Sequence, residues 1–335
     1  MELLRQVHEK NLVSWAAERP EVVVFSGDLT GSTEIRAFRD TYPDRFFNLG
    51  MAEQNMMSWA GGMAREGFTP FVHTFAVFIY RRALDQIEMS IAYPNLRVRM
   101  FGFLPGITTP GGVSHQAIDD IAVLRGLPNM TILEVGDATD VESVLDVAHA
   151  QDGPVYVRML RKEIPRLFPA AEPMKLDTAR VVREGTDVTV ITSGICTEEA
   201  MRAAAALEAR GVSVEHLHVT TLKPCSDARI VEACAKARYG VVTLENHTTI
   251  GGLGTCVAEL MAEHGVSNRL TKLGLFDTYA HGASREYLVK EYELDAMSLV
   301  RAIERLTGQP FDISDDELAA VRVSDFTGEG QLEAL

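Results

Sequence analysis

The chain carries at residues 48–56 the stretch NLGMAEQNM, which places one carboxylate, Glu53, in an apolar segment. An unpaired Glu in such surroundings is costly to desolvate unless it keeps its proton. A carboxyl group that holds a proton is suited to general acid–base chemistry. The alternative interpretation is a Glu near a helix N-terminus, where the helix dipole stabilises the charge. Taken alone, Glu53 is better explained as a residue at a helix N-terminus.

Two further motifs follow in the same half of the chain. Residues 67–78, GFTPFVHTFAVF, have the pattern of a buried strand that leads into an aromatic pair, Phe75 and Phe78. Residues 111–116, GGVSHQ, follow a loop rich in Gly, Pro and Thr and precede a helix predicted to open at residues 117–120. His115 in this loop is either a functional residue or one that lies near a helix cap.

Apolar runs that end in turn residues alternate with helical stretches along the whole chain, and residues 2–18 are predicted to form an amphipathic helix. These runs are typical of buried parallel strands. They lie at residues 20–28, 96–101, 130–134, 154–159, 187–194, 213–219 and 240–245. The alternation predicts an α/β protein with two doubly wound sheets.

The chain is long enough for two domains. Its 335 residues, 46% of them hydrophobic, allow each domain to bury a core. We expect a first domain at residues 1–165, a linker at 166–184 where periodicity is lost, and a second domain at 185–308. Residues 309–335 form an acidic, weakly periodic tail, which is either a loose or partner-covering extension or simply solvated.

Composition excludes several functional classes. A net charge of -15 argues against binding to nucleic acid or to an anionic membrane surface. The four cysteines lack C-x-x-C spacing, which predicts reduced thiols in a cytoplasmic protein rather than a zinc site or disulfide framework. No signal peptide and no run long enough to span a bilayer is expected.

In combination, the carboxylate, the aromatic pair and the Ser-His-Gln loop resemble the pyrimidine-binding domain of thiamine-diphosphate enzymes of the transketolase family. With the segment after residue 185 included, residues 1 to about 308 resemble the C-terminal half of a transketolase. The resemblance implies a transketolase pyrimidine-binding domain followed by a transketolase C-terminal domain. It also implies that residues 245–247 and 251–254 are structural or lie at a subunit contact.

The resemblance implies thiamine diphosphate as the cofactor. Its reactive carbon, C2 of the thiazolium, is deprotonated by its own aminopyrimidine once that ring is in the imino form. Glu53 matches the catalytic Glu that drives this tautomer, and Phe75 and Phe78 match the hydrophobic slot for the pyrimidine. Asp28, whose simpler role is helix capping, matches a residue near the thiazolium. For Phe78 a purely structural core role is equally compatible with the sequence.

Substrate contacts are implied in the same way. Arg5, Ser32 and Arg161 match positions that hold the sugar phosphate, for which guanidinium groups are well suited. His115 matches a catalytic histidine that contacts substrate hydroxyls. An Arg in a first helix, such as Arg5, is by default a surface residue.

Three positions depart from the family pattern. Leu104 replaces a phosphate-contacting His, and Gly111 replaces an Asp that reads a sugar hydroxyl, so a branched, deoxy, sulfonated or otherwise modified sugar becomes a plausible substrate. Arg81 replaces a Tyr of the aromatic cage, which leaves that cage incomplete.

One family motif is missing from the chain. The Gly-Asp-Gly segment and the later Asn that bind Mg²⁺ and the diphosphate do not occur. We therefore expect no metal site here, and expect Mg²⁺ to be held by an N-terminal-half transketolase subunit in an α2β2 heterotetramer.

Rival interpretations are the β subunit of a 2-oxoacid dehydrogenase E1 component, a fragment of 1-deoxyxylulose-5-phosphate synthase, and a non-catalytic partner subunit. The Ala-Glu-Gln-Asn and Ser-His-Gln motifs favour transketolase over the first. The synthase is normally one long chain, which argues against the second interpretation. Retention of Glu53 argues against the third, because an idle buried carboxyl is a net cost.

Overall fold

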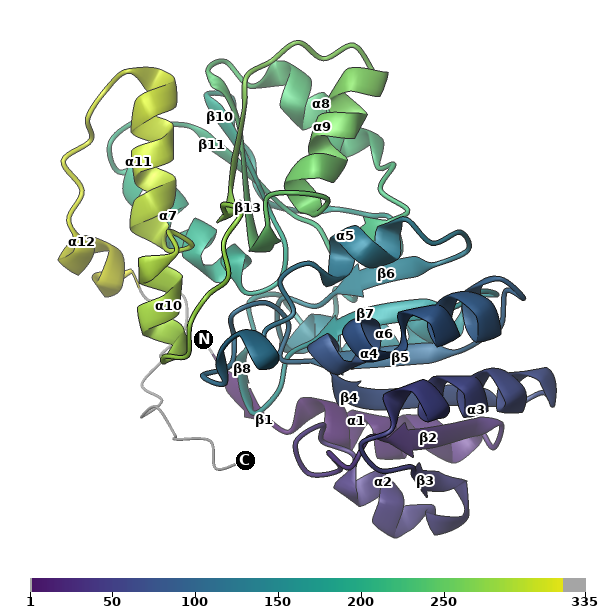
Figure 1. Ribbon diagram of the computed structural model, residues 1–335. Helices are drawn as coiled ribbons and strands as arrows, with labels where there is room; N and C mark the ends of the chain where they lie inside the picture. Colours follow the sequence, from purple (N-terminus) through teal and green to yellow (C-terminus); the bar gives the residue numbers. More distant parts are fainter. Residues whose placement is uncertain (1, 322–335) are drawn as a thin grey trace.

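The computed structural model describes residues 2–321 and contains two parallel-rich sheets with helices packed against them (Figure 1). The first sheet has seven strands, in the order β12 (Thr221–Lys223), β6 (Thr131–Glu134), β7 (Val155–Met159), β5 (Arg99–Phe103), β4 (Thr69–Phe75), β2 (Val22–Ser26) and β3 (Phe46–Asn48). All of its strand pairs are parallel except β12 with β6.

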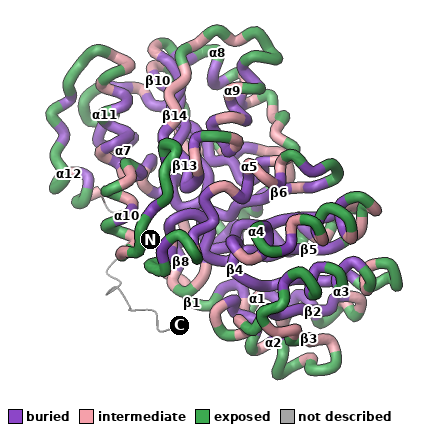
Figure 2. The backbone as a smooth tube through the Cα atoms, in the orientation of Figure 1, coloured by how far each residue is buried: buried purple, intermediate pink, exposed green. Residues whose placement is uncertain are grey.

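The second sheet has five strands, in the order β14 (Leu270–Leu275), β13 (Gly240–Thr248), β10 (Val188–Thr192), β11 (Val214–His218) and β9 (Arg180–Arg183). Strand β9 is antiparallel to β11, and the other pairs are parallel. Both sheets confirm the predicted α/β class, and each predicted apolar run overlaps a strand. The runs were recognisable because their strands are buried along most of their length, as Figure 2 shows.

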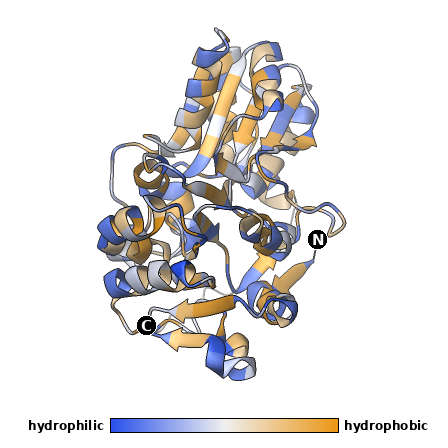
Figure 3. Ribbon diagram, turned by 90° about the vertical axis from the view of Figure 1, so that its right-hand side faces the viewer, coloured by the Kyte–Doolittle hydropathy of each residue, from blue (hydrophilic) through white to orange (hydrophobic). Residues whose placement is uncertain are grey.

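Helices alternate with the strands in both units. Those of the first unit are α1 (Val7–Trp15), α2 (Arg36–Thr41), α3 (Glu53–Arg65), α4 (Ala76–Gln86), α5 (Asp120–Arg125) and α6 (Ala138–His149). Those of the second are α7 (Cys196–Glu208), α8 (Ala228–Lys236), α9 (Leu253–Glu263), α10 (Arg285–Glu291), α11 (Ala296–Thr307) and α12 (Asp315–Ala320). Figure 3 shows hydrophobic strands beside helices that also carry hydrophilic residues. Within residues 2–321, no helix is both long and apolar enough to cross a bilayer.

The chain start differs from the predicted helix at residues 2–18. Residues Leu3–Arg5 form a strand, β1, that pairs antiparallel with β8 (Glu163–Pro165). Gln6 then adopts a left-handed conformation with φ of 53°, which interrupts a right-handed helix, and α1 begins at Val7. Arg5 is therefore a strand residue, and the predicted single helix is wrong over its first turn.

The acidic tail also differs from a solvated segment where the structure describes it. Helix α12 follows the buried side chains of Phe311 and Ile313, and its own Leu318 is 5% exposed. Arg210 of the loop after α7 pairs with Glu317 at 2.7 Å. Residues 309–321 thus pack against the second unit, because three apolar side chains outweigh the acidic composition. Residues 322–335 lie outside the described part of the chain.

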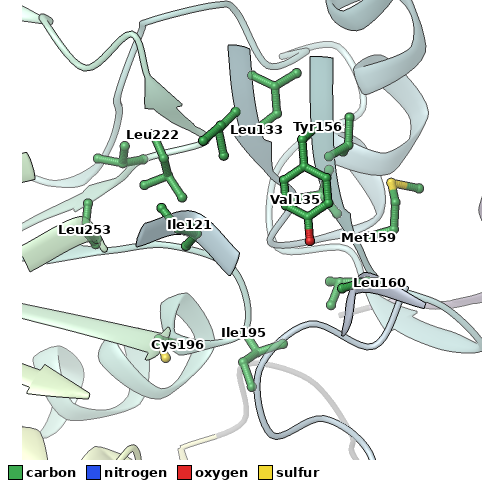
Figure 4. Close-up of a cluster of buried hydrophobic side chains, with 14 of the residues drawn as sticks. Ile121, Leu133, Val135, Tyr156, Met159, Leu160, Ile195, Cys196, Leu222 and Leu253 are labelled. Carbon is green, nitrogen blue, oxygen red and sulfur yellow. The ribbon is translucent and has the colours of Figure 1, made fainter. Parts of the chain in front are cut away.

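One hydrophobic core joins the two units. Figure 4 shows Ile121, Leu133 and Tyr156 of the first unit in the same cluster as Ile195, Leu222 and Leu253 of the second. Leu222 lies on β12, the strand that comes from the second half of the chain and completes the first sheet. This shared packing holds the second unit against the first sheet.

Candidate active site

Glu53 is the first residue of α3 and is 2% exposed. Its two carboxylate oxygens accept hydrogen bonds from Nη1 of Arg82, at 3.1 and 3.0 Å. The carboxyl is buried and lies at a helix N-terminus, as the sequence indicated, but it is paired with Arg82 and not left without a partner. The sequence analysis missed Arg82, although its position four residues after Phe78 puts the two on one face of α4.

Three rings lie beside this ion pair. Phe75 ends β4, Phe78 lies in the first turn of α4, and their centroids are 5.7 Å apart. The guanidinium of Arg82 lies 3.9 Å from the Phe78 centroid. The imidazole of His115 meets both phenyl rings edge-on, with centroids 6.2 Å from Phe75 and 5.4 Å from Phe78. A carboxylate, an aromatic wall and an imidazole, distant in sequence, thus form one continuous cluster.

The loop that carries His115 is braced from α4. Arg81 donates hydrogen bonds to the carbonyl oxygens of Val113 at 2.8 Å and of Gln116 at 3.3 Å, on either side of His115. The Ser114 hydroxyl is 2.9 Å from Nδ1 of His115. Arg81 therefore does not complete an aromatic cage; it holds the imidazole-bearing loop in place.

Gly111 and Leu104 have structural roles in the same loop. A Cβ added to Gly111 would lie 2.9 Å from Cβ and Cγ of His115, so the imidazole occupies the space that a side chain at position 111 would need. Leu104 is 6% exposed in the core, with φ of 56°. Position 104 therefore presents no polar group to a substrate.

The residues predicted to bind the substrate lie near the end of β7. Nη1 of Arg161 donates to the carbonyl oxygen of Ser32 at 2.9 Å, and its guanidinium lies 5.6 Å from the Phe75 centroid. Burial lowers the pKa of Arg161 from its ordinary value. Arg5 pairs with Glu163, which follows Arg161 by two residues, and the Arg5 side chain is 76% exposed. Arg161 and Ser32 thus adjoin the aromatic cluster, and Arg5 lies at the surface near them.

Glu34 is a further residue that the sequence analysis missed. It is 6% exposed, and its carboxylate accepts from the backbone N–H of Lys162 at 2.6 Å. Burial raises the pKa of Glu34 to about 7, which hydrogen bonding to Lys162 and the charge of Arg161 partly oppose. Glu34 and Lys162 both adopt left-handed conformations, with φ of 53° and 63°. The carboxylate thus fixes the strained turn that carries Arg161.

Asp28 is exposed, lies two residues after the end of β2, and has φ of 63°. Its backbone N–H donates to Oδ1 of Asn48 at 3.1 Å, and its carboxylate accepts from Nδ2 of Asn48 at 3.2 Å. These bonds join the carboxyl ends of β2 and β3. Asp28 thus lies at the carboxyl end of the strand next to β4, which carries Phe75. No group of three or more His, Cys, Asp or Glu side chains within residues 2–321 is placed to hold a metal ion.

Known proteins resemble this chain in sequence and in fold. The family model of the transketolase pyrimidine-binding domain matches residues 3–166, and that of the transketolase C-terminal domain matches residues 177–299. A solved structure described as a split gene transketolase, inactive beta4 tetramer, has a TM-score of 0.83 and 37% sequence identity. The match covers 91% of this chain and 98% of the other.

Two relatives are named as subunits of transketolases. A 6-deoxy-6-sulfo-D-fructose transketolase subunit of Clostridium sp. is 34% identical, over 91% of this chain and 94% of its own. An apulose-4-phosphate transketolase subunit of Actinobacillus succinogenes is 30% identical, over 89% of this chain and 96% of its own. The chain belongs to the transketolase family, as the C-terminal half of a split transketolase that carries the pyrimidine-binding and C-terminal domains.

Proposed function

We propose that the chain transfers a two-carbon ketol unit between anionic sugars, and does so only with a partner subunit that holds Mg²⁺ and the diphosphate of thiamine diphosphate. The observation that carries this proposal is the cluster of Glu53, Phe78, Phe75 and His115. A buried carboxylate beside an aromatic wall fits an aminopyrimidine, which offers ring nitrogens to hydrogen-bond and a flat face to stack.

Each residue has a distinct role in this proposal. Thiamine diphosphate, when bound, would supply the nucleophilic carbon for the transfer. Glu53 would share a proton with its pyrimidine ring, and Phe75 and Phe78 would hold that ring. Asp28 would lie on the thiazolium side. His115, oriented by Ser114, contacts substrate hydroxyls and moves protons to and from them.

We propose that Arg161, Ser32 and Arg5 receive the terminal anion of the substrate. Guanidinium groups bind phosphate or sulfonate through paired hydrogen bonds. The buried Leu104 and the bare Gly111 remove two polar contacts expected for ordinary sugars, and the two relatives are named for a sulfonated sugar and for apulose 4-phosphate. We therefore propose an unusual phosphorylated or sulfonated ketose as donor, with xylulose 5-phosphate used poorly.

The assembly proposed is an α2β2 heterotetramer with an N-terminal-half subunit. We propose domain bounds of 1–165 and 185–308, joined by a linker at 166–184 whose last residues include β9, the strand that pairs with β11 of the second sheet. The four free cysteines support a cytoplasmic location.

The test compares the full chain alone and mixed with its diphosphate-domain partner. Titration calorimetry with thiamine diphosphate and Mg²⁺ should show no tight binding by the chain alone, and ketol transfer should appear on mixing. Tight Mg²⁺-dependent binding by this chain alone would contradict the proposal. Oxidative decarboxylation of a 2-oxoacid by the mixture would instead identify an E1 β subunit, and no turnover would identify a non-catalytic partner.

A further inference from the structure

The loop at residues 104–116, which carries His115, is held by a side chain of the second unit. Asn246 on β13 accepts a hydrogen bond at Oδ1 from the backbone N–H of Ile107 at 2.9 Å. Its Nδ2 donates to the carbonyl oxygen of Pro105 at 3.1 Å. One amide thus pairs with a backbone donor and a backbone acceptor two residues apart, and the residue is 1% exposed.

Gly106, between the two bonded residues, is shaped to this amide. It has φ of 61°, and a Cβ at this position would overlap Cγ and Oδ1 of Asn246. Only a glycine both adopts this backbone conformation readily and leaves the space that the amide fills. The loop and Asn246 are therefore complementary in shape as well as in hydrogen bonding.

Asn246 is itself fixed by the first sheet. The buried Arg158 on β7 donates from Nη2 to the Asn246 carbonyl oxygen at 3.0 Å and to the Ala117 carbonyl oxygen at 3.1 Å. The same guanidinium pairs with Asp120 at 2.9 Å. Arg158 thus ties Asn246 to residue 117, directly after the loop. Asn246 is a rigid anchor between the two units.

The second unit holds the loop again close to His115. Nε2 of Gln116 donates to the carbonyl oxygen of His281 at 3.2 Å. A Cβ added to Gly282 would lie 2.7 Å from the carbonyl oxygen of Pro110, so the two backbones are in close contact. The loop is therefore bound to the second unit near its beginning and near its end, and Arg81 of α4 in the first unit also binds it near its end.

We propose that Asn246 is a positioning residue for ketol transfer, which sets the place of His115 through this loop. The inference rests on the proposed function. It assigns a role in the reaction to the second unit, which carries none of the candidate site residues. Residues 104–116 lie between β5 and α5 with little secondary structure of their own, so their position depends on these anchors. A displacement of about 1 Å at a reacting group lowers rates by roughly 10²-fold.

The first experiment needs neither cofactor nor partner. Hydrogen–deuterium exchange of the full chain is compared for wild type, Asn246→Ala and Asn268→Ala. Asn268 is the matched control, because its Nδ2 also bonds two backbone carbonyls of the second unit, those of Cys234 and Ala237. We expect peptides within residues 104–116 to exchange about tenfold faster in Asn246→Ala only. Unchanged exchange in the loop overturns the proposal.

The second experiment measures kcat/KM for the ketose donor with the partner subunit present. Asn246→Ala should lower kcat/KM about tenfold or more, and the same substitution in a His115→Ala background should have little further effect. Effects that add in full would show that Asn246 does not act through His115, and would overturn the proposal. If the wild-type mixture shows no ketol transfer, the proposed function fails, while the exchange result still tests the positioning of the loop.

A second variant covers the case in which Asn246→Ala does not fold. Asn246→Asp keeps an acceptor for the Ile107 N–H and loses the donor to Pro105, so it should show an intermediate increase in exchange across residues 104–116. Exchange equal to that of wild type in a folded Asn246→Asp chain, with unchanged kcat/KM, contradicts the proposal.

Discussion

Nη1 of Arg82 lies within 3.1 Å of both carboxylate oxygens of Glu53. The Glu53 side chain is 1% exposed, whereas that of Arg82 is 46% exposed, so the guanidinium stands between the buried carboxylate and solvent. The same guanidinium lies against Phe78. Arg82 is therefore the most exposed residue of this cluster.

Glu53→Gln should leave the fold intact and slow exchange of the C2 proton of bound thiamine diphosphate by roughly 10²-fold or more, because an amide cannot exchange a proton with the pyrimidine. The measurement is exchange at C2 followed by NMR in the complex with the partner subunit. Glu66→Gln, an exposed change just after α3, is the control. Wild-type exchange in Glu53→Gln would falsify the assignment.

Arg82→Ala should destabilise the chain by about 1–2 kcal/mol, because it leaves the Glu53 carboxylate buried without this partner, while the half-exposed guanidinium limits the loss. Denaturant unfolding of the wild type, of Arg82→Ala, of Glu53→Gln and of the double variant provides the check. The double variant should recover much of the stability. A double variant as unstable as the sum of the two single variants would argue against direct coupling.

Gly111→Ala should lower kcat/KM for the donor by about tenfold, because the new methyl group would lie 2.9 Å from the His115 side chain and displace it. Gly62→Ala is the matched control, since a Cβ there meets nothing within 4 Å. The measurement is kcat/KM for the donor, determined by steady-state kinetics of both variants with the partner subunit. Equal activity of the two variants would show that His115 tolerates the shift.

Arg161→Ala should raise KM for an anionic ketose about 10- to 100-fold, as expected from losing a charged hydrogen bond of roughly 1.5–3 kcal/mol. A donor without the terminal anion should be used equally by wild type and variant. Arg166→Ala, which removes a partly buried guanidinium bound to Glu142, serves as the control. An equal loss with both donors would place Arg161 outside the anion site.

Glu34 should make stability depend on pH. Its pKa is about 7 in the folded protein against an ordinary value of 4.5, so the folded state holds the proton more tightly than the unfolded state. The contribution of protonated Glu34 to the free energy of unfolding is then fully present below a pH of about 4.5. As the pH rises through 7, this contribution is lost, which lowers the free energy of unfolding by about 2–3 kcal/mol. Unfolding at pH of about 4.5 and about 8 should show this loss in wild type and not in Glu34→Gln. If the free energy of unfolding changes with pH in the same way in wild type and in Glu34→Gln, this role of Glu34 is refuted.

Local patterns of apolar residues in the sequence were sufficient to predict the fold class. A strand that is buried on both faces, such as Val22–Ser26, is apolar along its length and can be recognised from the sequence alone. The strands β1 and β8 were missed because each has only three residues and forms only when the other is present. Glu53, Phe75, Phe78 and His115 were found as separate motifs, and the structure brings them into one cluster.

The sequence by itself determined the α/β class, the order of the motifs and the types of candidate side chains, because apolar runs and short motifs are local properties of the chain. Only the tertiary structure decided which groups meet. Arg82 reaches Glu53 across 29 residues, Glu34 reaches Lys162 across 128, and Asn246 reaches Ile107 across 139. Such contacts depend on how sheets and helices pack, and no spacing within one element encodes them.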